Sequence, residues 1–270
     1  MDDPRRRRWE RLEHFDLIHA IESRPPRARA LIVGHGATLP GVASALESIA
    51  AALERRGVVA FTADITGAAG PDGTAVWPEG RAILPEDVAA WAGRVESPWT
   101  LAIGVGLGAA MLLAAAADLP AGCALALLGA PLEATAKSAW TSGDPVLGRE
   151  RTVSLWPTGD RVVASAVLDL LAEGPPGRSL AGAAMALERP LLAMALPGDE
   201  VTGRAHSELL FELAPRPKTL IVLDGADFQL GNARARGLGA RLVAEWAEER
   251  LVEREQGRLP RATAVRRDSG

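Results

Sequence analysis

A turn bounded by glycines is the feature of this sequence whose spacing points most directly to chemistry. The run Gly104-Val105-Gly106-Leu107-Gly108 follows a short apolar stretch and leads into a helical pattern. In a turn of the form G-x-S-x-G, a central serine is held above a sheet, where its hydroxyl attacks a carbonyl carbon. The outer glycines fit that turn, but its central residue is Gly106, which carries no side chain. The spacing therefore predicts a nucleophile turn that lacks its nucleophile.

Three other short motifs each come directly after an apolar run that predicts a strand. They are His35-Gly36-Ala37, Gly198-Asp199-Glu200 and Gly225-Ala226-Asp227-Phe228. Because the carboxyl ends of parallel strands meet at one edge of a sheet, we expect these motifs to lie beside the Gly106 turn. Backbone N–H groups near Leu107 and Ala37 would then form an oxyanion hole, which binds the oxygen of a carbonyl, enolate or carboxylate.

The elements that must position these motifs alternate between short apolar runs and longer helical patterns. Strands are predicted at 30–33, 58–65, 99–105, 123–128, 190–196 and 219–223. Helices are predicted at 42–53, from 85 onward, at 108–117, near 206–213 and from 232 to about 252. This alternation is typical of an α/β fold whose central sheet is mostly parallel and flanked by helices.

A single α/β core with one insertion explains the order of these elements. The core is predicted at 16–131 and 189–252, because the alternation stops between these ranges and then resumes. Residues 132–188 mix helical patches with glycine, proline and serine, which indicates an inserted cap. Residues 1–15, with four consecutive arginines, are predicted to form a basic N-terminal arm, and residues 253–270 a flexible tail.

Together the four motifs resemble those of the α/β-hydrolase superfamily, in particular its capped serine-aminopeptidase and thioesterase-like branch. The resemblance covers about residues 16–250 and includes the order of the motifs along the chain. His35-Gly36 is similar to the family's H-G oxyanion loop, and Gly225–Phe228 is similar to its G-A-x-H loop, which carries the catalytic histidine. The resemblance implies the α/β-hydrolase fold with a cap and a site at the carboxyl ends of the strands.

Two positions depart from the catalytic triad that the resemblance implies. It places Gly106 at the nucleophile position, Asp199 at the acid position and Phe228 at the histidine position. Loss of the nucleophile or of the base alone costs a serine hydrolase roughly a millionfold in rate. We therefore predict a degenerate triad that does not support ester hydrolysis through an acyl-enzyme.

The positions of the four histidines agree with the absence of a catalytic base. His14 and His19 precede the predicted sheet, His35 lies in the oxyanion loop and His206 opens a helix, so none follows the last strand. In this family the histidine of the H-G loop is usually structural. Asp227, one residue before Phe228, is predicted to be a solvated loop residue.

A site of this kind is expected to bind a ligand rather than to cleave an ester. Gly106 leaves space where the serine would stand and Phe228 makes that corner apolar, so we expect a small acyl or carbonyl compound, or a partner protein. The alternative is a lyase, isomerase or cyclase that uses the oxyanion hole and an acid or base at Asp199, Glu200 or His35. The residues expected to line the site are His35, Gly36, Ala37, Gly106, Leu107, Trp140, Trp156, Glu200 and Phe228.

Dinucleotide and metal binding are both disfavoured by the sequence. Gly104, Gly106 and Ala109 satisfy the pattern G-x-G-x-x-A, but a dinucleotide site needs an acid after the next strand, and that strand ends at Leu128–Pro131 without one. The histidines form no metal-binding motif, and the single cysteine, Cys123, is expected in the core. We therefore predict no cofactor and no metal.

Composition narrows the class of partner. The chain has 270 residues, with 30 Lys and Arg against 34 Asp and Glu, a net charge of -4 and 48% hydrophobic residues. This near-neutral balance argues against nucleic acid or an anionic membrane as the partner. The longest apolar run, Ala109–Ala117, is far shorter than the roughly 20 residues that span a bilayer, and no targeting segment is evident. We predict a cytoplasmic protein and leave a homo-oligomer open.

Overall fold

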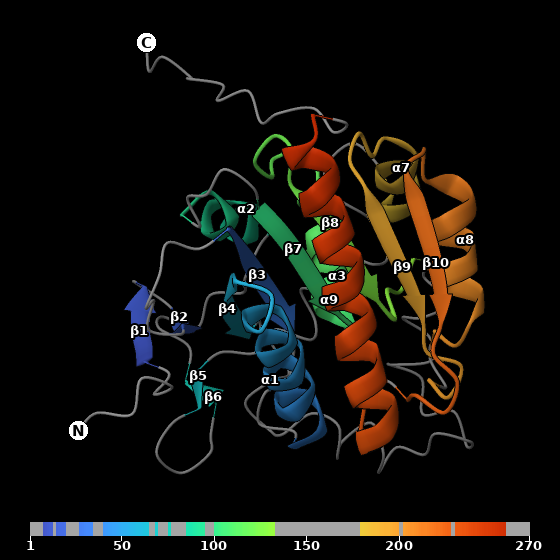
Figure 1. The fold of residues 1–270 in the computed structure, drawn as a ribbon. Coiled ribbons are helices and arrows are strands. Elements are labelled where there is room, and N and C mark those ends of the chain that lie inside the picture. Colours follow the sequence, from blue (N-terminus) through green and yellow to red (C-terminus); the bar gives the residue numbers. More distant parts are fainter. Residues whose placement is uncertain are drawn as a thin grey trace.

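The computed structural model describes eleven segments of the chain, namely 8–12, 15–19, 27–34, 40–64, 68–69, 75–76, 85–94, 100–132, 179–199, 202–227 and 230–257. Their centre is an eight-stranded sheet (Figure 1). In spatial order its strands are β1 (Arg8–Leu12), β2 (Phe15–His19), β4 (Val58–Asp64), β3 (Ala28–Gly34), β7 (Thr100–Val105), β8 (Ala124–Leu128), β9 (Leu191–Ala195) and β10 (Lys218–Val222). Two short strands, β5 (Ala68–Ala69) and β6 (Ala75–Val76), pair with each other outside this sheet.

The six strands from β4 to β10 are parallel to one another, whereas β2 runs antiparallel to β4 and β1 antiparallel to β2. The central strands read as continuous apolar runs, because helices cover both faces of a parallel sheet. Every residue of β7, β8 and β9 is buried. Since the strands are parallel, the loops that follow β7, β8, β9 and β10 leave the sheet at the same edge.

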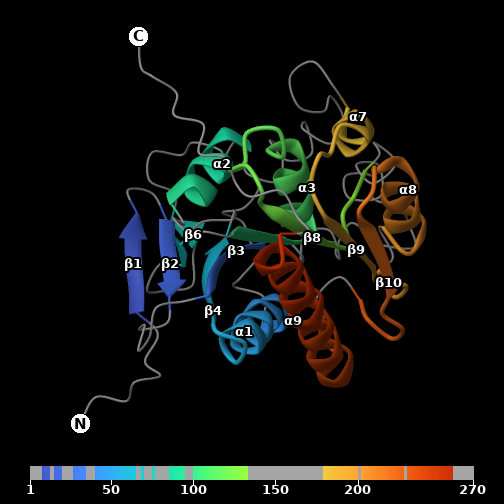
Figure 2. The ribbon, with the colours of Figure 1, turned by 45° about the horizontal axis from the view of Figure 1, so that its top comes forward.

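Helices lie on both faces of the sheet (Figure 2). The helices α1 (Pro40–Glu54) and α9 (Ala233–Glu255) cover one face with an apolar cluster that includes Ile49, Ile103 and Val243. The other face is covered by α2 (Pro85–Arg94), α3 (Leu107–Ala114), α7 (Leu180–Met185) and α8 (Ala205–Leu213). The predicted fold class, a mostly parallel sheet flanked by helices, is therefore confirmed.

Three boundaries differ from the sequence expectation. The predicted basic arm, residues 1–15, contains β1, which is the edge strand of the described sheet. The predicted tail, residues 253–270, contains the last turn of α9. The predicted cap, residues 132–188, contains α7, whose Leu180, Ala183 and Ala184 are buried against the core. Residues 133–178 of that cap lie outside the described residues.

Long-range ion pairs hold the last helix in place. The guanidinium of Arg27, just before β3, pairs with Glu255 at 3.1 Å, and that of Arg56, just after α1, pairs with Glu248 at 3.1 Å. Arg254 also donates to the backbone carbonyl of Gly122 at 3.3 Å. These contacts join the polar end of α9 to the core, beside the buried Leu251 of the same helix. Among the described helices, none combines the length and apolar character needed to cross a membrane.

Candidate functional site

The turn between β7 and α3 has the backbone of a nucleophile elbow. Gly106, at its centre, has φ +59° and ψ -121°, a conformation that side chains rarely adopt and that stores strain at functional sites. Its N–H donates to the carbonyl of Leu128 at 2.9 Å, and its carbonyl accepts from the N–H of Ala109 at 3.0 Å. The first bond joins the turn to the end of β8, and the second begins the helix. The sharp strand-to-helix turn predicted from the sequence is therefore present.

The outer glycines of this turn are required by close packing. A Cβ atom at Gly104 would lie 2.3 Å from the Cα of Ala109, and one at Gly108 would lie 2.3 Å from the carbonyl oxygen of Val33. No side chain fits at either distance without a backbone shift. The glycines thus let α3 pack directly against β7 and β3. The start of α3 therefore lies at the carboxyl edge of the sheet.

Asp199 lies on the loop that follows β9, at the same edge of the sheet. Its side chain is buried, with 4% exposed, and its carboxylate accepts a hydrogen bond from the hydroxyl of Thr202. A Cβ atom at Gly129, just after β8, would lie 3.5 Å from the carboxylate oxygen Oδ2 of Asp199. The predicted acid position is therefore a buried carboxylate that packs against the turn after the neighbouring strand.

The loop after β10 packs directly against the Asp199 loop. The N–H of Gly198 donates to the carbonyl of Ala226 at 2.8 Å. The carboxylate of Asp227 forms a hydrogen bond within this loop, in which Oδ1 accepts from the N–H of Gly231 at 3.0 Å. This bond is exposed, so the structure agrees with the interpretation of Asp227 as a solvated loop residue. The two loops expected to carry an acid and a histidine are thus neighbours.

His206 contacts this edge of the sheet in a way that the sequence did not indicate. Its Nδ1 atom accepts a hydrogen bond from the backbone N–H of Leu132 at 3.1 Å. From the sequence, His206 was predicted only to open a helix, and α8 begins next to it at Ala205. The two residues are separated by 74 positions, so no local pattern could have revealed the contact.

Several solved structures with a similar fold are esterases or other hydrolases. The esterase domain of a Rhodothermus marinus protein superposes with a TM-score of 0.63 and 22% identity, over 87% of this chain and 92% of that one. Est1E from Butyrivibrio proteoclasticus has a TM-score of 0.60 and 15% identity, over 91% and 99%. An α/β-hydrolase enzyme from the metagenome of lagoon sediments at Mar Chica, Morocco, has a TM-score of 0.61 and 14% identity, over 90% and 99%.

The chain has the α/β-hydrolase fold. No protein-family model and no curated protein matches the sequence. The identity to the superposed structures is low, so the likeness shows the fold alone. The glycine turn, the Asp199 loop and the loop after β10 occupy the carboxyl edge of the sheet, where ligands bind in open α/β folds.

Of the predicted site residues, the structure describes Gly106, Leu107 and Asp199, and it brings all three to this edge. The turns that carry them follow β7 and β9, the two strands on either side of β8, with the turn after β8 between them. Hydrogen bonds join the end of β8 to the strands on both sides of it. The carbonyl of Leu128 accepts from the N–H of Gly106 at 2.9 Å, and the N–H of Gly129 donates to the carbonyl of Met194 at 3.0 Å. The other predicted site residues lie outside the described residues: His35, Gly36, Ala37, Trp140, Trp156, Glu200 and Phe228.

Cys123 lies at the opposite end of the sheet, next to the first residue of β8, and is fully buried. Burial raises the pKa of its thiol to about 11, and the nearby charge of Arg189 offsets part of that rise. Its placement in the core follows the sequence expectation. Within the described ranges, no group of three His, Cys, Asp or Glu residues is arranged to hold a metal ion.

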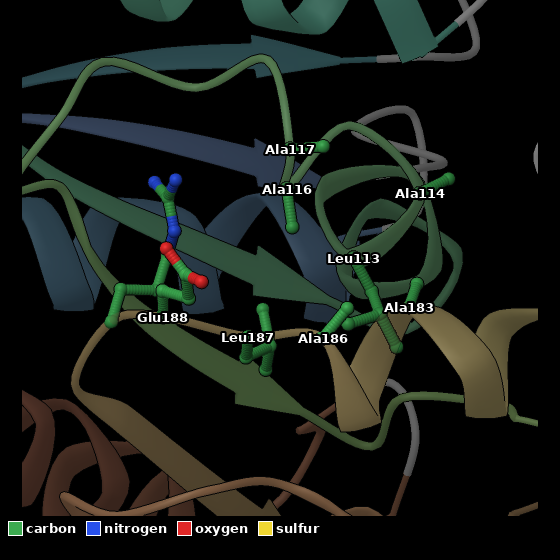
Figure 3. A pocket seen from close by; sticks show the side chains of 9 residues that line it. Leu113, Ala114, Ala116, Ala117, Ala183, Ala186, Leu187 and Glu188 are labelled. Atoms are coloured by element: carbon green, nitrogen blue, oxygen red, sulfur yellow. The ribbon is translucent and has the colours of Figure 1, made fainter.

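A cavity of about 220 Å³ lies at this same opposite edge, where α3 ends (Figure 3). Its walls are Leu113 and three alanines from the end of α3 and the turn that follows, Ala183 and Ala186 from α7 and the residue after it, and the segment Leu187–Arg189. We call it the Arg189 cavity. It is separated from the Gly106 turn by the full length of α3.

Proposed function

We propose that this protein uses the carboxyl edge of its α/β-hydrolase fold to bind a small acyl or carbonyl compound, without ester hydrolysis through a serine nucleophile. The observation that carries the proposal is Gly106, which holds the strained backbone of a nucleophile elbow but carries no hydroxyl. A residue with a side chain would be strained at this positive φ, whereas glycine adopts it without a Cβ clash. The turn therefore keeps the backbone geometry of the elbow without the residue that attacks a carbonyl carbon, which favours a role for its backbone.

The backbone of the turn supplies hydrogen-bond donors for the oxygen of a carbonyl ligand. The N–H of Leu107 belongs to the first turn of α3, where amide groups point along the helix axis with a partial positive charge. An oxyanion hole stabilises a ligand oxygen through such fixed donors, and these donors do not depend on a serine or a histidine side chain. The absence of a side chain at Gly106 leaves room for the ligand above the turn.

Asp199, at the acid position, accepts a hydrogen bond from a residue that follows it closely in the chain. Asp199 is buried and accepts a hydrogen bond from Thr202, so its carboxylate has a structural role in addition to any chemical one. Phe228 at the histidine position offers no proton-transfer group. Both features support binding without turnover.

A second candidate is a non-hydrolytic enzyme, such as a lyase, isomerase or cyclase. The observation in its favour is the same Asp199, because a carboxylate that is 4% exposed at the site edge is a potential acid or base. Asp199→Asn separates the two candidates. Ligand binding that survives this substitution supports the binding function, whereas turnover of a carbonyl substrate that is abolished by it supports the enzyme.

The test of the proposed function is a pair of measurements on the unmodified chain. A fluorophosphonate probe, which labels activated serines, should leave the protein unlabelled, and 4-nitrophenyl acetate should be hydrolysed no faster than in buffer. Titration with acetamide and with acetone, followed by the amide NMR signals, should shift the signal of Leu107. Labelling by the fluorophosphonate would contradict the loss of the nucleophile. Shifts confined to other parts of the chain would contradict the proposed binding site.

A further inference from the structure

The Arg189 cavity has the size of a small-molecule site. An enclosed cavity of about 150 Å³ holds a benzene molecule, and this one, which is partly open to solvent and exposes more polar than apolar surface, measures about 220 Å³. Alanine side chains make up most of its walls, and Figure 3 shows the short side chains of Ala114, Ala116, Ala183 and Ala186 around it. Small side chains at the meeting point of α3 and α7 leave the space that longer ones would fill.

Arg189 brings a positive charge to this cavity, whose walls combine alanine and leucine side chains with exposed polar groups. Its side chain is half-buried, and Nη1 donates to the carbonyl of Pro120 at 3.4 Å. Its charge also lies near enough to the uncharged thiol of Cys123 to lower the pKa of that thiol. Within the described part of the chain, no carboxylate forms an ion pair with this guanidinium. A guanidinium stays charged at every physiological pH, so its partial burial beside neutral groups favours an anion.

The geometry of a guanidinium leaves donors for that anion. Arginine has five N–H donors, and the bond to Pro120 engages one of them. A carboxylate accepts two parallel hydrogen bonds from the remaining donors. Because the bond to Pro120 restrains Arg189, part of its side-chain freedom is already lost before an anion binds.

We propose that the Arg189 cavity binds a small organic monocarboxylate, with the carboxylate on Arg189 and the apolar body against Leu113, Leu187 and the alanines. The other charged residue of the lining, Glu188, is exposed, so water already solvates its carboxylate and it does not call for a cationic ligand. The site lies at the far end of α3 from the Gly106 turn. The inference is therefore independent of the function proposed for that turn.

The test compares benzoate with its neutral isostere benzamide on the unmodified protein at constant ionic strength. Isothermal titration or amide NMR shifts should show benzoate binding with a dissociation constant of about 1 mM, and benzamide binding at least about tenfold more weakly. The NMR shifts should centre on Ala114, Ala183 and Arg189. Equal affinity for the two compounds, or no benzoate binding up to about 20 mM, would overturn the proposal.

Three variants locate the site. Arg189→Gln removes the charge and should weaken benzoate binding by about tenfold or more. Ala114→Leu keeps the charge but fills the cavity at a half-buried position, and should weaken binding to a similar extent. The matched control is Arg216→Gln, because Arg216 lines a second hollow of about 430 Å³ that shares Ala186–Arg189 but not the α3 wall. This control should bind benzoate like the unmodified protein, and a loss equal to that of Arg189→Gln would contradict the assignment.

Discussion

His206 and Leu132 are joined by a hydrogen bond that fixes the start of α8 against the chain as it leaves β8. The backbone N–H of Leu132 donates to Nδ1 of His206 at 3.1 Å. An imidazole nitrogen accepts only when it carries no proton, so the bond requires a neutral ring protonated on Nε2. Because Asp199 and Thr202 shortly precede α8, the bond also steadies the loop that carries the acid.

Substitution of His206 tests whether this bond stabilises the fold. His206→Leu leaves the N–H of Leu132 without this acceptor and should lower the free energy of unfolding by about 1–3 kcal/mol. His206→Gln, whose side-chain oxygen can accept, should recover part of the loss. Urea unfolding measures both effects. Two variants as stable as the unmodified protein would show that the bond contributes nothing.

Gly106→Ala tests the strain at the centre of the turn. An alanine at φ +59° and ψ -121° should lower the free energy of unfolding by about 1–3 kcal/mol. The matched control is Gly93→Ala, because Gly93 lies in α2, is exposed, and has open space around a Cβ atom. That control should raise the stability by up to about 1 kcal/mol, since alanine favours a helix. Thermal or urea unfolding of the two variants measures both changes. A Gly106→Ala variant that is as stable as the unmodified protein would contradict the prediction.

Asp199 and Thr202 should be energetically coupled. Each of Asp199→Ala and Thr202→Val removes one partner of a buried hydrogen bond, and each should cost about 1–3 kcal/mol of unfolding free energy. In the double variant the losses should fall short of their sum by about 0.5–3 kcal/mol, because the second substitution has no bond left to break. Strictly additive losses would mean that the hydroxyl does not support the carboxylate.

The fold was predictable because its signals are local. The strands β8 and β9 at the centre of the parallel sheet are continuous apolar runs, and the predicted strand at 99–105 corresponds to Thr100–Val105. Helix ends were less predictable where partners distant in sequence decide them. Glu255 in the last turn of α9 pairs with Arg27, which lies 228 positions away in the sequence. No window of the sequence contains both residues.

The site was predictable only in part, for the same reason. The glycine spacing predicted the turn at Gly106, and Gly198-Asp199 predicted a carboxylate at the same edge, because each motif lies within a few residues. The partner of Asp199 within its loop was not foreseen, and neither was the contact between His206 and Leu132. Those contacts arise from the way separate turns pack, which a single sequence does not display.

The buried thiol of Cys123 should make the protein less stable at high pH. Burial raises the pKa of Cys123 from 9.0 to about 11, so between these values the unfolded chain releases a proton that the folded chain retains. The free energy of unfolding is therefore unaffected below pH 9, falls as the pH rises from 9 towards 11, and decreases by about 3 kcal/mol in all. The chain has no tyrosine and only two lysines, so few other groups titrate in this range. Urea unfolding at a series of pH values should show the decline, and Cys123→Ala, which removes the thiol, should flatten it. A decline of the same size in Cys123→Ala would assign the effect to other groups.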